Sequence, residues 1–178
     1  NGLSGMTALI ALVALGMIAQ QVGRPDIADL CRILLAGILG FLALNYPSGR
    51  IFLGDAGAYV TGFLLAWIGI LILMAAPHAT PWAILLTVFW PVADTALAIY
   101  RRRKLRRSAM QPDRLHAHQL VMRSLEIQWL GRSRRHISNP LTTVILLPFI
   151  ISPAAAGVIF YNNPAATFLC VAGFGLLF

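Results

Sequence analysis

The sequence predicts an all-α, polytopic integral membrane protein with about six transmembrane helices. Of its 178 residues, 58% are hydrophobic and 11% are charged, whereas soluble domains carry about 25% charged residues. A soluble core of this size could not hide so much apolar surface, so lipid must cover part of it. Most Lys and Arg residues lie between Arg101 and Arg135. This confined charge indicates a single transmembrane domain over residues 1–178 with one basic loop at 101–140, and it gives no reason to expect nucleic acid as a partner.

Six apolar segments account for the predicted helices, because about 20 helical residues span the hydrocarbon core of a bilayer. They are residues 6–20, 27–45, 58–75, 82–100, 141–161 and 165–178. Short polar connections rich in Gly and Pro separate most of them. The basic loop is the one long connection.

The orientation follows from the basic loop, because cytoplasmic loops of membrane proteins carry an excess of Lys and Arg. The loop has only two acidic residues, Asp113 and Glu126. Counting back through the predicted helices places residues 1–5 and 46–56 on the same, cytoplasmic side. We therefore expect a multi-pass membrane protein whose polar, chemically capable segments share the cytoplasmic face.

The segment 52–57, Phe-Leu-Gly-Asp-Ala-Gly, lies at the mouth of a hydrophobic helix. Its glycines permit close approach of a ligand, and the free N–H groups of the following helix favour phosphate. The Asp55 carboxylate suits a hard cation such as Mg²⁺. The competing interpretation is an Asp that only caps the helix. Phe52 lies in the same polar loop and could stack on a ligand ring.

Asp94 lies inside the segment 82–100, three residues after Pro91, which is expected to kink the helix. An ionisable residue in such a segment is a candidate functional residue. It could equally be a structural partner for one of Arg101–Arg103 or for a helix end.

The loop also contains Arg114, His116 and His118. In an extended segment the two histidines point to the same side. Two histidines are a weak metal signal, because zinc sites usually have three or four protein ligands. With Arg114 they could instead hold phosphate oxygens, or the segment could be a solvated polar loop. The basic run at 101–107 is expected to touch anionic lipid headgroups.

Four blocks in this order resemble motifs of the polyprenyl-phosphate N-acetylhexosamine-1-phosphate transferase family. They are Asn-Gly-Leu-Ser-Gly at 1–5, Gly-Arg-Ile-Phe-Leu-Gly-Asp-Ala-Gly-Ala at 49–58, Pro-Val-Ala-Asp-Thr at 91–95 and Pro-Asp-Arg-Leu-His-Ala-His at 112–118. Each block alone is modest, but the ordered set is specific.

The resemblance implies a reaction on the cytoplasmic face, in which a sugar-1-phosphate passes from a UDP-N-acetylhexosamine to undecaprenyl (polyprenyl) phosphate and UMP is released. It implies a first membrane step in making cell-envelope polysaccharide, such as O-antigen, or peptidoglycan. It also implies dependence on Mg²⁺, with Mn²⁺ as an alternative, and leaves a homodimer open.

Residue roles follow from the same resemblance. Asp55 is expected to bind the metal, and the expected catalytic residues are Asp55, His116 and His118. The expected substrate-binding residues are Asn1, Phe52, Gly54, Asp94 and Arg114.

Three positions depart from the family pattern: Asn1 replaces an Asp, Ala58 a Ser and Gln119 a third His. Family members have about ten membrane helices and an Asp-Asp pair upstream of the first block here. The sequence is therefore expected to be a C-terminal portion that is inactive on its own. The alternatives are an inactive membrane scaffold and a transporter.

Overall fold

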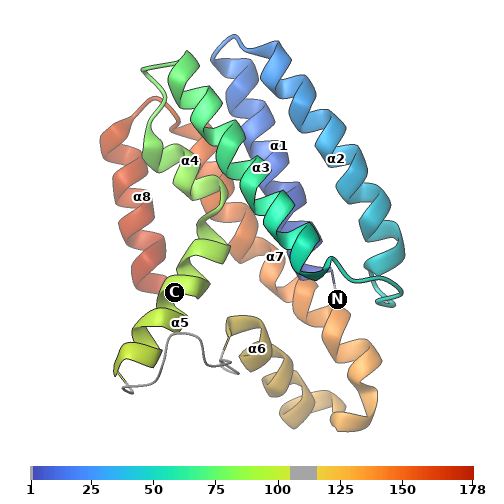
Figure 1. Ribbon diagram of the computed structural model, residues 1–178. Coiled ribbons are helices and arrows are strands. Elements are labelled where there is room, and N and C mark those ends of the chain that lie inside the picture. Colours follow the sequence, from blue (N-terminus) through green and yellow to red (C-terminus); the bar gives the residue numbers. More distant parts are fainter. Residues whose placement is uncertain (1, 105–115) are drawn as a thin grey trace.

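The computed structural model describes residues 2–104 and 116–178, and all regular structure in that part is helical (Figure 1). The helices are α1 (Leu3–Gln21), α2 (Pro25–Asn45), α3 (Gly54–Ala75), α4 (Pro81–Thr87), α5 (Phe89–Lys104), α6 (Ala117–Leu125), a π-helical turn η1 (Glu126–Leu130), a 3₁₀ turn η2 (Arg132–Arg134), α7 (Arg135–Ile159) and α8 (Pro164–Leu177). Each of the six apolar segments is helical, which confirms the predicted all-α class.

Four of the described helices, α1, α2, α3 and α7, are long and apolar enough to cross a membrane. The pair α4 and α5 adds a fifth span if the two count together, and α8 is a shorter apolar helix of 14 residues. The chain is thus a multi-pass membrane protein. The prediction of one helix over residues 82–100 was wrong, because α4 and α5 meet at an angle of 85°.

The break between α4 and α5 follows from Pro91, the third residue of α5. A proline inside a helix has no N–H to donate, and its ring clashes with the carbonyl four residues earlier. That earlier residue is Thr87, the last residue of α4, and the chain turns at Val88. The kink expected near Pro91 is therefore present one turn upstream of the proline itself.

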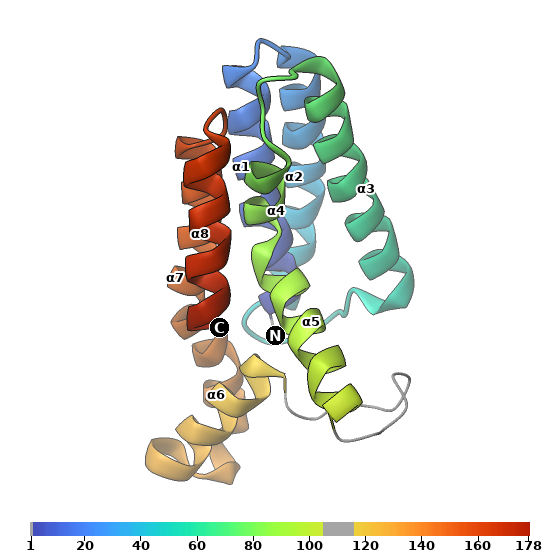
Figure 2. The same ribbon diagram turned by 90° about the vertical axis from the view of Figure 1, so that its left-hand side faces the viewer.

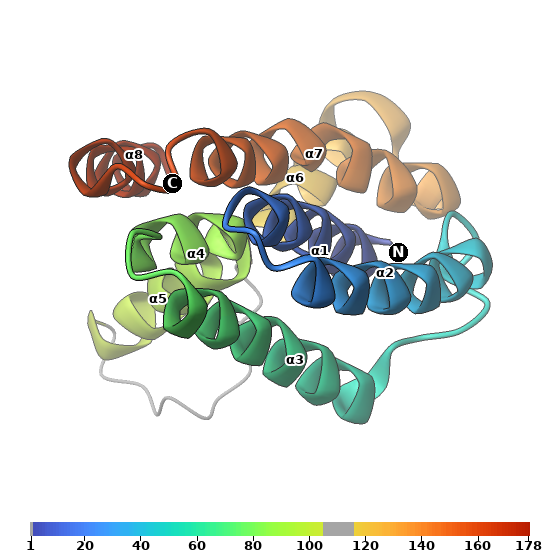
Figure 3. The ribbon, with the colours of Figure 1, turned by 90° about the horizontal axis from the view of Figure 1, so that it is seen from above.

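Helix α1 lies at the centre of the bundle, where it contacts α2, α3, α4 and α7 (Figure 3). Its buried side chains are mostly small or aliphatic: Gly5, Ala8, Ala11, Leu12, Ala14, Leu15, Ile18 and Ala19. Small residues let membrane helices approach closely, so that dispersion forces hold them together without a hydrophobic drive from water.

Gly157 shows how tight this packing is, because it lets α7 lie directly against α4. A Cβ at this position would come within 2.8 Å of the carbonyl oxygen of Ala83. We expect Gly157→Ala to destabilise the protein in detergent by about 1–3 kcal/mol, because backbone cannot yield as a side chain can. Gly173→Ala in α8 is the matched control, since its Cβ would meet nothing within 4 Å. Thermal unfolding of both variants checks this prediction, and equal stability would contradict it.

The described part of the predicted loop at 101–140, residues 101–104 and 116–140, is largely helical. Its first residues extend α5 to Lys104, its last residues belong to α7, and α6, η1 and η2 form a helical hairpin between residues 117 and 134. Helix α6 packs against α7. This hairpin and the end of α5 both lie below the bundle in Figure 2.

The same end of the bundle collects the other polar segments. The chain start, the beginning of α3, the end of α5 and α6 lie together at the lower end of Figure 1. The predicted convergence of these segments on one face is therefore confirmed.

Candidate active site at one end of the bundle

A cavity of about 310 Å³ lies where the four sequence blocks meet. Its lining comes from the starts of α1 and α3, the first half of α5 and the first turn of α6: Leu3, Ser4, Thr7, Ala8, Leu53, Ala58, Thr61, Gly62, Leu65, Trp90, Pro91, Asp94, Thr95 and His118. Aliphatic and aromatic walls therefore surround a small set of polar groups. This composition suits a ligand that is part apolar and part polar.

Asp55 lies in the first turn of α3, which begins at Gly54, one turn earlier than expected. Its exposed carboxylate makes no hydrogen bond or ion pair with the described residues, and no side chain caps the helix. The capping interpretation therefore does not describe Asp55. Asp55 does not line the cavity itself, but Ala58 and Thr61 do, one and two turns further along α3.

Gly54 and Phe52, which precede Asp55, differ in backbone conformation and exposure. Gly54 adopts a φ of +64°, a conformation that other residues rarely take. Phe52 is 76% exposed just before the helix. Its ring is therefore on the surface, three residues before Asp55, while Leu53 contributes to the cavity wall.

Asp94 connects α5 to the start of α6. Its Oδ1 accepts a hydrogen bond from the backbone N–H of Ala117 at 3.2 Å, and its Oδ2 accepts one from Nδ1 of His116 at 2.8 Å. A carboxylate can only accept, so Nδ1 of His116 carries the proton. The Nε2 atom is then the one left to receive a proton or bind a ligand. Asp94 was expected to pair with an Arg of 101–103 or with a helix end, and it binds the N-terminal end of α6.

His116 and His118 stack with ring centroids 5.8 Å apart and planes 16° apart. They share one side, as expected for an extended segment, because His116 is still extended and α6 begins only at Ala117. Burial lowers the pKa of His118 below its usual value; the Asp94 carboxylate opposes this shift and His116 adds to it. His118 therefore faces the cavity mainly as a neutral imidazole.

The lowered pKa of His118 predicts a pH dependence of stability. The unfolded chain binds a proton at this residue near the ordinary value of 6.5, and the folded chain binds it at lower pH. Acidification below 6.5 should therefore reduce the free energy of unfolding, whereas stability should be flat above that pH as far as His118 contributes. Thermal unfolding across this range checks the effect. An equal acid-side loss in His118→Gln would contradict it.

Asn45 is a structural residue of the site that the sequence analysis missed. It is buried at the end of α2, where its Oδ1 accepts from the Gly2 N–H at 2.7 Å and its Nδ2 donates to the Ile51 carbonyl at 2.7 Å. One amide thus ties the chain start to the loop that leads into α3 and Asp55. An isolated Asn at the end of an apolar segment gives no local signal of this role.

Two predicted substrate-binding residues, Asn1 and Arg114, lie outside the described residues. The remaining predicted residues lie at this end of the bundle, with Asp94 and His118 in the cavity wall. Ser4, Thr7, Thr61, Trp90 and Thr95 also line the cavity and were not singled out from the sequence.

The donor groups at this end of the bundle offer few ligands for a magnesium ion. Within the described ranges, no three His, Cys, Asp or Glu side chains are grouped so as to hold a metal. Mg²⁺ is usually bound by one or two carboxylates together with substrate phosphates and water, not by an all-protein cage. Asp55, an exposed and unengaged carboxylate, fits one such ligand.

Fold and site together define a polytopic membrane protein with a mainly apolar cavity that holds a few polar groups at one end. The family model described as Glycosyl transferase family 4 matches residues 1–73. These residues are similar to that family, in agreement with the resemblance seen in the motifs of the chain.

Curated relatives support the assignment over more of the chain. It is 30% identical to the undecaprenyl-phosphate alpha-N-acetylglucosaminyl 1-phosphate transferase of Haemophilus influenzae over 98% of this chain and 48% of that protein. The proteins of the same name from Pasteurella multocida and Escherichia coli are 31% and 33% identical, over 95% and 70% of this chain and 46% and 35% of theirs. The chain thus spans about half or less of the length of these relatives. No solved structure matches it significantly.

Proposed function

We propose that this chain forms part of an enzyme that transfers a sugar-1-phosphate from a UDP-N-acetylhexosamine to polyprenyl phosphate and releases UMP. The observation that carries the proposal is that four blocks, far apart in sequence, meet around one cavity at one end of a membrane bundle. The names of the curated relatives agree with this reaction.

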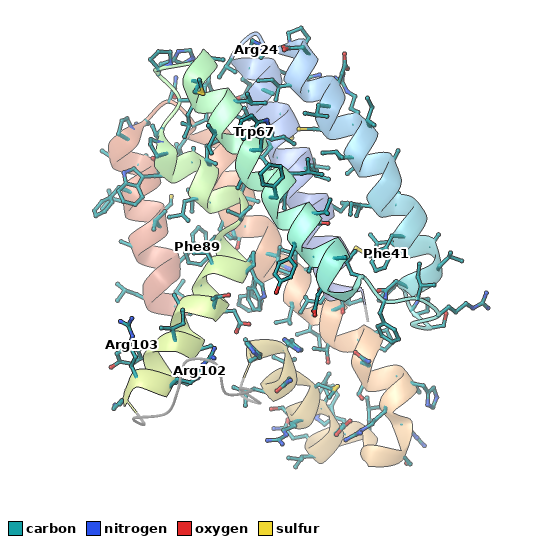
Figure 4. All side chains as sticks on the ribbon, in the orientation of Figure 1. Arg24, Phe41, Trp67, Phe89, Arg102 and Arg103 are labelled. Atoms are coloured by element: carbon teal, nitrogen blue, oxygen red, sulfur yellow. The ribbon has the colours of Figure 1, made fainter. Side chains whose placement is uncertain are left out.

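The chemistry of the reaction matches the charges at this end. An oxygen of the lipid phosphate attacks the sugar-bearing phosphorus, the bond to the bridging oxygen breaks, and UMP leaves with that oxygen. Both substrates are anionic, so positive groups must offset their repulsion. Arg102 and Arg103 project from the lower end of α5 (Figure 4) and extend positive charge over this face.

Each residue of the site then has a role. His118 in the cavity wall and His116, oriented by Asp94, contact phosphate oxygens, and Nε2 of His116 is the atom able to take up or return a proton. Phe52 offers a ring for the uracil, and Gly54 lets the backbone approach the donor. Asp55 would hold Mg²⁺, or Mn²⁺ in its place, which when bound neutralises phosphate charge. Asn1 and Arg114 complete the substrate-binding set.

The apolar part of the cavity suits the lipid substrate. Leu53, Leu65 and Trp90 form walls beside the polar groups, so a phosphate can meet His118 while the first carbons of its lipid stay out of water. We place this face on the cytoplasmic side of a bacterial inner membrane, because the basic residues gather there.

The test is an assay of UMP release with protein expressed from its complete natural gene. Membranes would be mixed with undecaprenyl phosphate, UDP-N-acetylglucosamine and Mg²⁺, and then with other UDP-N-acetylhexosamines. The proposal expects UMP release that requires the lipid phosphate. Silence with every donor in folded protein would overturn it in favour of an inactive scaffold, and ion flux independent of UDP-sugars would favour a transporter. The chain 1–178 alone is expected to be inactive.

A further inference from the structure

The hairpin of α6, η1 and η2 leaves an apolar tip uncovered. Ile127 and Trp129 in η1 are 82% and 80% exposed, and Leu120 on α6 is also exposed. Val121, the next residue of α6, packs against the buried cluster of Trp90, Leu146 and Ile150. The inner side of the hairpin thus packs against the bundle, whereas its outer side exposes large apolar side chains.

The charge around this tip has one sign. Arg123, Arg134 and Arg135 are exposed on the hairpin and at the start of α7. Glu126 is the only acidic residue between residues 116 and 139. Its side chain is 5% exposed and accepts a hydrogen bond from Nε of Arg135 at 3.1 Å, so its charge is turned inward and already paired.

The position of the hairpin decides which partner fits. It adjoins the first turn of α7, a helix apolar and long enough to cross the membrane. It also lies at the same end as the basic end of α5 (Figure 1). Tryptophan is enriched at membrane–water interfaces, where its ring lies among headgroups, and arginines near an anionic leaflet bind its phosphates.

We infer that this hairpin is an interfacial anchor that binds anionic phospholipid, with Ile127 and Trp129 among the headgroups and Arg123 and Arg134 on their phosphates. Because α6 begins beside Asp94 and carries His118, the anchor fixes the height of the cavity mouth relative to the lipid surface. The inference does not depend on the proposed transfer reaction.

The test measures which lipids surround Trp129 in the intact chain reconstituted in bilayers. The fluorescence of Trp129 is obtained as the difference in tryptophan fluorescence between the wild-type chain and Trp129→Phe. Brominated phosphatidylglycerol and brominated phosphatidylcholine would be compared as quenchers at equal mole fraction. We expect stronger quenching by the phosphatidylglycerol, an excess that falls with added salt. Each of Arg123→Gln and Arg134→Gln should lower the excess by about fivefold.

Arg24→Gln is the matched control, because Arg24 lies at the opposite end of the bundle (Figure 4), and it should leave the excess unchanged. Quenching of Trp129 by aqueous iodide and by neither lipid would overturn the inference. The inference would also be overturned if Trp129 were protected from both iodide and the brominated lipids in a way that depends on protein concentration. That result would indicate a second copy of the chain on this surface. Equal quenching by the two lipids would overturn the anionic preference.

Discussion

Replacing Asp55 by Asn is expected to reduce sugar-phosphate transfer by about a hundredfold or more. The side chain keeps its size, but its charge is lost from the first turn of α3, where it lies exposed and without a partner in the described structure. Stability should change little, because no hydrogen bond or ion pair with the described residues is removed. The measurement is UMP release from membranes with protein expressed from its complete natural gene, as a function of Mg²⁺ concentration.

Asp29→Asn is the control for this variant. Asp29 is an exposed carboxylate near the start of α2, away from the cavity, and it pairs with Arg32. It should retain transfer at the wild-type level. Asp55→Glu, which keeps the charge, should recover part of the activity. An Asp55→Asn protein with the wild-type rate and the wild-type Mg²⁺ dependence would remove Asp55 from the metal role.

The second large effect is expected from Asp94→Ala, through the position of α6. The change removes acceptors for the Ala117 N–H and for Nδ1 of His116. Hydrogen bonds to charged groups contribute about 1.5–3 kcal/mol each, so the first turn of α6 should open and His118 should leave the cavity wall. We expect transfer to fall by about tenfold to a hundredfold, mainly in kcat, together with faster amide hydrogen exchange in α6.

The exchange measurement separates this positioning role from a general loss of stability. Leu120→Ala is the control, because Leu120 is exposed on α6 and is not a partner in the hydrogen bonds of Asp94. Asp94→Asn should be intermediate, since an amide oxygen can still accept from Ala117. Unchanged exchange in α6 of Asp94→Ala would show that Asp94 does not hold this helix in place.

Much of this arrangement follows from local features of the sequence. Apolar length alone predicts the helical segments, and the confined Lys and Arg residues predict that the polar segments share one end. Pro91 predicts a kink, because a missing N–H is a property of the residue itself. The bend falls at Val88 and reaches 85°, and this angle depends on how α4 packs against α7 and α8.

The parts that sequence reasoning missed depend on contacts between distant residues. Residues 117–125 were expected to be loop but form helix α6. This helix depends on distant contacts, because its start is held by Asp94, 23 residues earlier, and α6 packs on α7. Asn45 was missed for the same reason, since its partners Gly2 and Ile51 become neighbours only in the folded bundle. The roles of Asn1 and Arg114, which lie outside the described residues, stay predictions.

The central claim is that the cavity between α1, α3, α5 and α6 holds the reacting groups, and filling it tests this most directly. Gly62 lines the cavity, and a Cβ there would meet nothing within 4 Å, so Gly62→Leu should fold while occupying the space. Gly37→Leu in α2 is the matched control, because that position is also open. The account predicts that lipid-dependent UMP release is lost in Gly62→Leu and kept in Gly37→Leu. Full release by a folded Gly62→Leu protein would contradict it.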